Sequence, residues 1–239
     1  MGVMYGVDPT WAGQTNEGRT HIATKGIVQS GLMLNLDAGV LSSYPGTGNT
    51  WTDLSGNGNT GTLNGAGYNP ANGGSIVFDG TDDYVSNTMP SPGSLPITFD
   101  FWVNTNNVFP LGIFDTAPNQ ANVLRQSNRL GFADSYVEWW NANPRVLLGL
   151  SALTWNNITI EYSFTTNRTI KYYRNGNLIS TTTGTTDPTF AWTTLNFGTI
   201  NGNSNWYSGK ISLIEIYNRA LTATEIQQNY LATKSRYFS

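Results

Sequence analysis

The chain has 239 residues, with 12 basic and 15 acidic side chains, a formal net charge of −3, one histidine and no cysteine. Without cysteine, disulfide scaffolds, thiol enzymes and cysteine-ligated metal sites are excluded. The mildly acidic balance gives no basic surface for phosphate groups, so we expect no nucleic acid partner. The 26 glycines and the aromatic share of 13% are typical of an all-β protein, in which aromatic residues suit strands and glycine suits tight turns.

The first thirty residues differ from the rest of the chain. Residues 1–30 are polar, contain glycine and show no sustained hydrophobic periodicity, so we interpret them as an extended N-terminal arm that precedes a folded domain at 31–239. They lack the charged and apolar regions of a secretory signal peptide. The chain also lacks an apolar run approaching the ~18 residues of a membrane helix. We therefore expect synthesis in the cytoplasm and no membrane partner.

Short runs of alternating polarity between turn-forming clusters follow the arm. This pattern predicts a β-sandwich or barrel and disfavours βαβ units. Within residues 97–103, for example, the odd positions are apolar, while Thr98, Asp100 and Trp102 occupy the opposite face. The strands expected on this basis are residues 32–36, 75–78, 97–103, 146–150, 158–164, 170–173, 178–182, 195–200 and 211–217.

One of these connections is an Asn-Gly pair. Asn175 and Gly176 separate two β-prone runs. A type I′ turn needs a positive φ angle at both central residues, and these are the residue types that adopt it most readily. We therefore predict a β-hairpin with a two-residue loop.

A single helix is expected near the end of the chain. Thr222 and Glu225 have the spacing of a capping box, and Leu221 and Ile226 have the spacing of a hydrophobic staple. The helix should run from about residue 223 to residue 231, and we expect it to close one end of the sheets.

Three segments resemble a known family. They are residues 34–39 (LNLDAG) with 51–59 (WTDLSGNGN), then 74–85 (GSIVFDGTDDYV), and finally 216–222 (IYNRALT) followed by Glu225. In this order they resemble the laminin-G-like, concanavalin A-like lectin/glucanase superfamily, in the form found in bacteria and phages. The resemblance implies a two-sheet antiparallel jelly-roll sandwich, which the strand pattern favours independently.

The last of these segments also has implied roles. The resemblance implies that Tyr217 and Arg219 tie the final strand to the helix. Ser212 stands where many relatives carry an aspartate that contributes to a structural calcium site. This difference argues against calcium at that position.

Two stretches have spacings that suggest metal binding. Residues 53–58 imitate the start of an EF-hand loop, but its twelfth position is Asn64 where a bidentate glutamate is required. Asp79, Asp82 and Asp83 form the densest acidic cluster, and hard carboxylate oxygens at that spacing could hold Ca²⁺. The alternative, which we favour, is a turn in which the aspartates cap backbone amides. We expect no required cofactor, with calcium as the open alternative.

No set of residues predicts catalysis. Glycoside hydrolysis needs two carboxylates at a defined separation, and the Glu-x-Asp-x-x-Glu pattern of the superfamily's hydrolases is absent. Four acidic residues lie singly on strand-like runs, where two could meet across a sheet, but we interpret them as surface residues: Asp100, Glu138, Glu161 and Glu215. The sole histidine, His21, lies in the arm. We expect a protein without catalytic residues that is not an enzyme.

Carbohydrate recognition would use aromatic faces with neighbouring polar side chains. Trp139, Trp140 and Asn141 offer these types, as do Trp206 and Tyr207. The alternative is packing, because successive strand residues point to opposite faces and at least one of the tryptophans at 139 and 140 is expected in the core. We interpret the remaining candidates as packing residues: Trp51, Trp102, Trp155 and Trp192.

Two functions remain. The first is a structural or adhesion protein of a phage virion, such as a capsid decoration protein or a small tail-fibre component. It would dock on neighbouring virion proteins through the arm, with Tyr5, Trp11 and His21 as anchors, and be oligomeric in the assembly. The virion location rests on the resemblance. The alternative is a lectin-like module that recognises cell-surface glycans, and a glycoside hydrolase ranks third.

Overall fold

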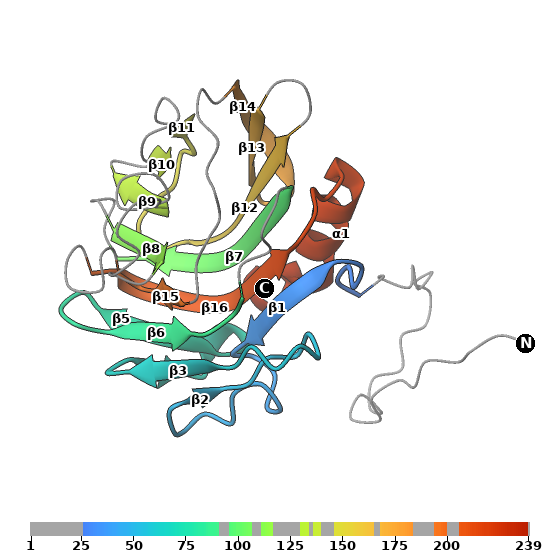
Figure 1. Ribbon diagram of the computed structural model, residues 1–239. Coiled ribbons are helices and arrows are strands. Elements are labelled where there is room, and N and C mark those ends of the chain that lie inside the picture. Colours follow the sequence, from blue (N-terminus) through green and yellow to red (C-terminus); the bar gives the residue numbers. More distant parts are fainter. Residues whose placement is uncertain are drawn as a thin grey trace, which may run out of the picture.

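The computed structural model describes residues 26–90, 96–106, 111–116, 130–133, 136–139, 146–164, 168–183, 194–199 and 206–238. Within 111–139 the description covers the backbone alone. Two antiparallel sheets make up most of the described chain, as Figure 1 shows. The expected all-β sandwich with a C-terminal helix is therefore confirmed.

The first sheet, sheet A, has the strand order β14-β13-β12-β7-β16-β5-β4, and β1 pairs with β16 beside β5. Its strands are β1 (Leu32–Asp37), β4 (Gly67–Asn69), β5 (Ser75–Asp79), β7 (Ile97–Thr105), β12 (Trp155–Phe164), β13 (Arg168–Arg174), β14 (Asn177–Thr183) and β16 (Ser208–Tyr217). The longest of them, β7, β12 and β16, lie side by side in the middle of the sheet.

The second sheet, sheet B, has the order β11-β10-β9-β8-β15-β6-β3-β2. Its strands are β2 (Thr50–Trp51), β3 (Gly61–Asn64), β6 (Tyr84–Asn87), β8 (Leu111–Thr116), β9 (Leu130–Ala133), β10 (Tyr136–Trp139), β11 (Val146–Leu147) and β15 (Leu195–Phe197). Every expected strand overlaps one of the observed strands. The helical elements are η2 (Ala71–Gly73), α1 (Ala223–Thr233) and η3 (Lys234–Arg236).

The main core lies between the sheets. The apolar positions of β7 face it, so the predicted alternation of residues 97–103 is confirmed. Buried side chains from both sheets complete this core, among them Leu36, Phe78, Val85, Ile160, Phe197 and Ile214. Burial of apolar surface on this scale is the dominant favourable contribution to folding.

The opposite, outer face of sheet A is covered as well. Helix α1 begins with the predicted capping box and places Ile226 against the rings of Tyr173 and Tyr217 on that face. Trp102 donates its indole N–H to Thr233 Oγ1 at 2.8 Å, and its ring stacks on Tyr237 with centroids 3.9 Å apart. The helix therefore lies over the outer face of sheet A, which corrects the expectation that it closes one end of the sheets.

The predicted Asn-Gly hairpin is confirmed. It connects β13 and β14, with φ angles of 51° at Asn175 and 74° at Gly176. A β-carbon on Gly176 would lie 2.5 Å from Gln227 Oε1 of α1, so the tip of the hairpin rests against the helix.

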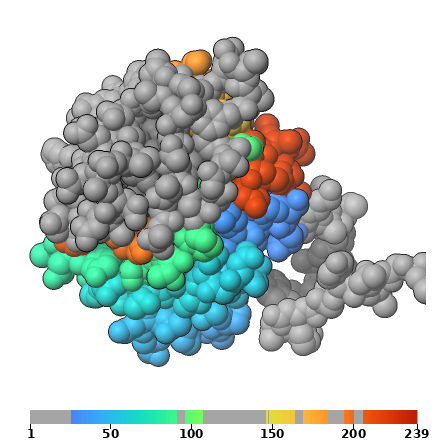
Figure 2. All heavy atoms as spheres, viewed as in Figure 1, coloured from blue at the N-terminus to red at the C-terminus, as the bar shows by residue number. Residues whose placement is uncertain are grey.

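Residues 26–30 are attached to the same helix. The carbonyl of Gly26 accepts a hydrogen bond from Gln228 Nε2 at 2.6 Å, and the Val28 amide donates to Asn229 Oδ1 at 2.9 Å. In Figure 2 the surfaces of α1 and of the first described residues adjoin. The expected arm anchors Tyr5, Trp11 and His21 lie outside the described residues. In the part of the chain that is described, no helix has the length and apolar character needed to cross a membrane.

Candidate functional site

The acidic cluster forms the turn between β5 and β6. One carboxylate oxygen from each of Asp79, Asp82 and Asp83 lies within 4.8 Å of the others. Asp79 Oδ1 accepts a hydrogen bond from the Thr81 amide at 2.7 Å, and Asp83 Oδ2 accepts one from the Asp79 amide at 2.8 Å. Two of the three aspartates therefore cap backbone amides, as the favoured interpretation predicts. The Asp79 and Asp82 side chains are exposed. Calcium binding by the cluster stays a prediction.

Neighbouring glycines let other segments pack against this turn. A β-carbon on Gly65 would lie 2.3 Å from Asp83 Oδ1, and one on Gly80 would lie 2.9 Å from the Ser208 side chain. Both glycines have positive φ angles, which side chains rarely allow. Burial raises the pKa of the Asp83 carboxyl, and the nearby charges of Asp79 and Asp82 raise it further, against the lowering effect of the Asp79 amide.

Two half-buried aromatic rings lie beside the acidic turn. The centroids of Tyr84 and Trp206 are 6.3 Å apart, and the ring planes are inclined at 38°. Tyr84 directly follows the acidic turn, and Trp206 lies two residues before Ser208, which pairs with Asp79. The structure thus brings the predicted Trp206 to the predicted acidic residues. We call this set the rim site: Asp79, Asp82, Asp83, Tyr84 and Trp206.

Sequence reasoning missed Tyr84, although it immediately follows the acidic cluster. Its role depends on contact with a residue far along the chain, and residue spacing alone does not predict that contact. The rim site presents groups that an external ligand can contact. It combines aromatic surface with exposed carboxylate oxygens that accept hydrogen bonds.

The loop that imitates an EF-hand has a structural role. Asp53 is buried, and its carboxylate accepts hydrogen bonds from the amides of Asn35, Ser55 and Asn59 and from the Ser55 hydroxyl. The loop also supplies Ser55 Oγ, Asn57 Nδ2 and Asn59 Nδ2 to the carbonyl of Met33, where the β1–β16 register shifts. The loop therefore fixes β1, which agrees with the rejection of an EF-hand.

A comparison of the sequence with models of known protein families shows which family this chain belongs to. A family model described as the concanavalin A-like lectin/glucanases superfamily matches residues 79–227, more than half of the chain. The chain belongs to this superfamily. No curated protein sequence matches this superfamily member.

Solved structures share the fold of this concanavalin A-like chain at low identity. The botulinum neurotoxin type G receptor-binding domain matches with a TM-score of 0.64 and 17% identity, covering 84% of this chain and 51% of that one. The botulinum neurotoxin serotype D ligand-binding domain, in complex with N-acetylneuraminic acid, matches with a TM-score of 0.63 and 16% identity over 85% and 51%. The chain thus spans about half the length of these neurotoxin domains.

A third structure matches over nearly its whole length. Domain 4 of AbnA, an extracellular arabinanase from Geobacillus stearothermophilus in complex with arabinotriose, has a TM-score of 0.60 and 17% identity. The match covers 83% of this superfamily member and 98% of that domain. At these identities the similarity shows the fold.

The structure corrects one of the predicted ligand-binding residues of this concanavalin A-like domain. Tyr207 is fully buried, its ring packs edge-on against Phe78 with centroids 5.6 Å apart, and its hydroxyl donates to the Lys210 carbonyl at 3.2 Å. A ring in the core presents no face to a glycan. The side chain of Trp139, as well as Trp140 and Asn141, lies outside the described residues.

Three of the tryptophans assigned to packing, Trp51, Trp102 and Trp155, are buried, as predicted. Trp192, the fourth, lies outside the described residues. Trp206 is therefore the predicted ligand-binding tryptophan whose side chain the structure places.

Ser212 makes two hydrogen bonds with neutral groups. It is fully buried, its hydroxyl donates to the Gly74 carbonyl at 2.6 Å, and it accepts a hydrogen bond from the Tyr237 hydroxyl at 2.7 Å. Through these two hydrogen bonds the Ser212 hydroxyl connects the bulge in β16 to Gly74 and to the C-terminal segment.

Three of the four acidic residues on strands, Asp100, Glu161 and Glu215, are not surface residues, which overturns that interpretation for them. Asp100 and Glu215 lie directly opposite each other across β7 and β16, and each is 1% exposed. Glu161 is equally buried and forms an ion pair of 2.6 Å with Lys171. Because α1 covers this face, the opposed carboxylates have no access to a polysaccharide. The side chain of Glu138 lies outside the described residues.

Proposed function

We propose that this chain is a carbohydrate-binding module without catalytic activity, which recognises cell-surface glycans through the rim site. The pairing of the half-buried rings of Trp206 and Tyr84 beside exposed carboxylates is the observation that carries the proposal. Membership of the lectin/glucanases superfamily and the fold shared with an arabinotriose-bound domain support it. The burial of Asp100 and Glu215 beneath α1 supports the absence of hydrolysis.

The chemistry of the rim site suits a sugar. The apolar C–H face of a pyranose or furanose ring packs on an aromatic face, and Trp206 and Tyr84 offer such faces with little conformational freedom to lose on binding. The carboxylates of Asp79 and Asp82 accept hydrogen bonds from hydroxyl groups and fix the orientation of the ring. A few polar groups beside an apolar surface are typical of small-molecule sites.

A glycan array with the full-length chain tests this function. The bound glycan is then titrated calorimetrically into the wild type and into Trp206→Ala, with Leu41→Ala as the matched control because Leu41 is 79% exposed and lies outside the rim site. We expect Trp206→Ala to lower the affinity at least about tenfold, since a well-packed aromatic anchor contributes about 2 kcal/mol or more. The urea midpoint should stay unchanged. Binding of no glycan, or equal affinity in both variants, would refute the proposal.

The virion role stays a separate prediction. Because residues 26–30 are bound to α1, the deletion that tests docking through the arm should end at residue 25. Loss of particle association with glycan binding retained would support the virion role. Release of reducing ends from a polysaccharide panel would instead contradict the absence of enzymatic activity.

A further inference from the structure

The opposed carboxylates beneath α1 form a closed polar cluster. Asp100 Oδ2 accepts a hydrogen bond from Thr159 Oγ1 at 3.2 Å, and Asp100 Oδ1 accepts one from Asn157 Nδ2. Glu215 Oε2 accepts hydrogen bonds from the Tyr217 hydroxyl at 2.7 Å and from Asn229 Nδ2 at 2.9 Å. Directly opposed side chains in antiparallel strands have β-carbons about 5 Å apart. The two carboxyl groups are therefore close neighbours.

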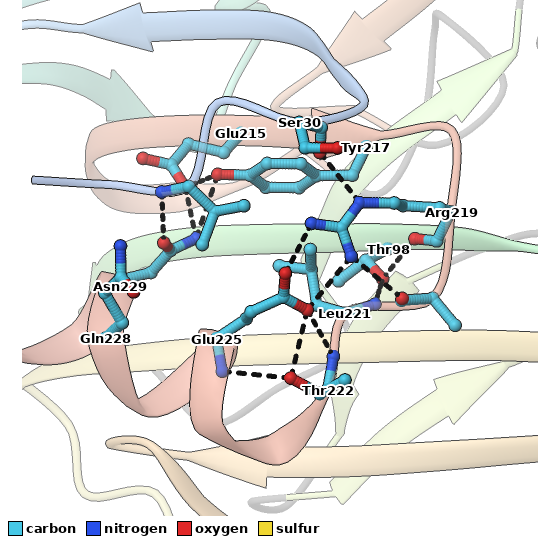
Figure 3. A network of polar contacts seen from close by, with 12 residues as sticks. Ser30, Thr98, Glu215, Tyr217, Arg219, Leu221, Thr222, Glu225, Gln228 and Asn229 are labelled. Atoms are coloured by element: carbon cyan, nitrogen blue, oxygen red, sulfur yellow. Dashed lines mark hydrogen bonds and ion pairs between the residues drawn. The ribbon is translucent and has the colours of Figure 1, made fainter. Parts of the chain in front are cut away.

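One carboxylate oxygen of the Asp100–Glu215 pair has no hydrogen-bond donor among the described residues. Glu215 Oε1 is buried and unpartnered, and Figure 3 shows it pointing away from Tyr217 and Asn229. A buried acceptor without a donor carries a desolvation penalty of about 1–3 kcal/mol. A proton between the two carboxyl groups would remove that penalty.

The basic groups around the pair are already bound to other acids. Arg236 of η3 contacts both oxygens of Asp37, at 2.7 and 2.8 Å. Lys171 on β13 is paired with Glu161 on β12.

The remaining elements packed against the pair bring no positive charge to it. Arg219 is paired with Glu225 at the start of α1, at 2.6 Å. The other neighbouring groups, on β13, β16 and α1, are neutral: Tyr173, Tyr217 and Asn229. With both carboxyls ionised, the pair would carry two buried negative charges, and Arg236, whose charge lowers the pKa of Glu215, is itself paired with Asp37.

We propose that Asp100 and Glu215 share a single proton and that this proton holds α1 on the outer face of sheet A. Two carboxylates that share a buried site cannot both ionise without a large cost. Burial raises the pKa of Asp100 to about 7, against the lowering effect of its hydrogen bonds from Asn157 and Thr159. Burial, and next the charge of Asp100, raise the pKa of Glu215.

Asn229 extends the effect to the N-terminal segment. Its Nδ2 group donates to Glu215 and to Tyr217, while its Oδ1 accepts from the Val28 amide at 2.9 Å. One side chain of α1 thus contacts the acid pair and the segment at residues 26–30. Release of α1 from the sheet also removes the hydrogen bonds that this segment makes with the helix.

The pH dependence follows from proton linkage. Once α1 leaves the sheet, water reaches the pair and both carboxyls ionise with pKa values of about 4. Between that value and the raised pKa values of the buried pair, the closed state holds one more proton than the open state. The equilibrium constant for opening should therefore rise about tenfold per pH unit across this range and level off above it. The closed helix is most stable at acidic pH.

Hydrogen exchange with mass spectrometry on the full-length chain measures this opening. Protection factors, corrected for intrinsic exchange, are followed for peptides covering 26–31 and 223–233 from about pH 4 to about pH 7 and above. In the wild type both peptides should lose protection together. In Glu215→Gln, the new amide can donate to the ionised Asp100 carboxylate, so the pH dependence should fall to well below half of the wild-type slope, and Asp100→Asn should act likewise. The control Glu161→Gln removes a buried acid that has its own partner and should keep the wild-type slope.

Each outcome decides the proposal. Wild-type protection that does not change with pH refutes the shared proton. Pair variants that each keep about half of the wild-type slope show that the two carboxyls titrate independently, which also refutes it. The series is repeated with calcium chloride and with EDTA. Protection that calcium raises in the wild type and not in Glu215→Gln would assign the pair to a cation in place of the proton.

Discussion

Replacing Asp53 by asparagine tests whether its loop stabilises β1 through hydrogen bonds or binds a metal ion. The Asp53 carboxylate accepts from the amides of Asn35, Ser55 and Asn59, each at 2.9 Å, and from the Ser55 hydroxyl at 2.7 Å. Each oxygen serves two donors. In Asp53→Asn an NH₂ group replaces one of these oxygens. The two donors that faced that oxygen would then face a donor and lose their hydrogen bonds.

The expected cost is large for a change of so few atoms. Hydrogen bonds to charged groups contribute about 1.5–3 kcal/mol each, so losing two of them should lower the free energy of unfolding by about 3 kcal/mol. With a urea m-value of about 3 kcal/mol/M for a domain of this size, the midpoint should fall by about 1 M. The variant remains folded, because domains have about 5–15 kcal/mol of stability.

Urea unfolding followed by tryptophan fluorescence measures this change, with Asp82→Asn as the control because Asp82 is exposed. The control should stay within about 0.5 kcal/mol of the wild type. An unchanged midpoint for Asp53→Asn would refute the stabilising role of the Asp53 hydrogen bonds. A midpoint that calcium raises in the wild type and not in the variant would show that Asp53 binds metal.

Three further changes test the supports of α1 and the hairpin, each by urea unfolding. Gly176→Ala should cost about 1 kcal/mol, because Gly176 has a φ angle of 74°, and an unchanged midpoint would contradict the type I′ turn. Arg236→Met should cost about 2 kcal/mol, because it leaves the buried Asp37 carboxylate without its partner, and the double variant with Asp37→Asn should recover most of the loss. The hydrogen bond from Arg219 lowers the pKa of Glu225 to about 2, so its stabilising contribution is present above about pH 4.5 and is lost as the pH falls toward 2. Glu225→Gln should therefore differ most from the wild type near neutral pH and converge with it in acid.

The sequence predicted the elements whose signals are local. The Asn175–Gly176 turn and the capping box at Thr222 follow from interactions within a few residues, and both are confirmed. Short strands such as β3 and β4 carry little alternation and were missed, because they form through pairing with distant strands.

The rim site was predicted in its parts and not as a whole. Trp206 and the acidic turn were candidates, whereas their meeting point at Tyr84 depends on how β6 and the start of β16 come together in space. Tyr207 was misassigned because two adjacent aromatic residues give no indication of which one faces the core.

The outer face of sheet A shows most clearly what alternation can and cannot predict. In β7 the pattern correctly separated two faces, but it does not state whether the polar face meets water or another element. Trp102 was the available signal, since a large aromatic side chain among polar residues is rarely left in solvent when an amphipathic helix follows in the chain. Once Trp102 is covered by α1, Asp100 on the same face must be covered too, and so must Glu215, which lies directly opposite on β16. The burial of two unpaired acids is thus a consequence of packing one helix over one tryptophan, and it is why the pH dependence of this fold should reside in α1.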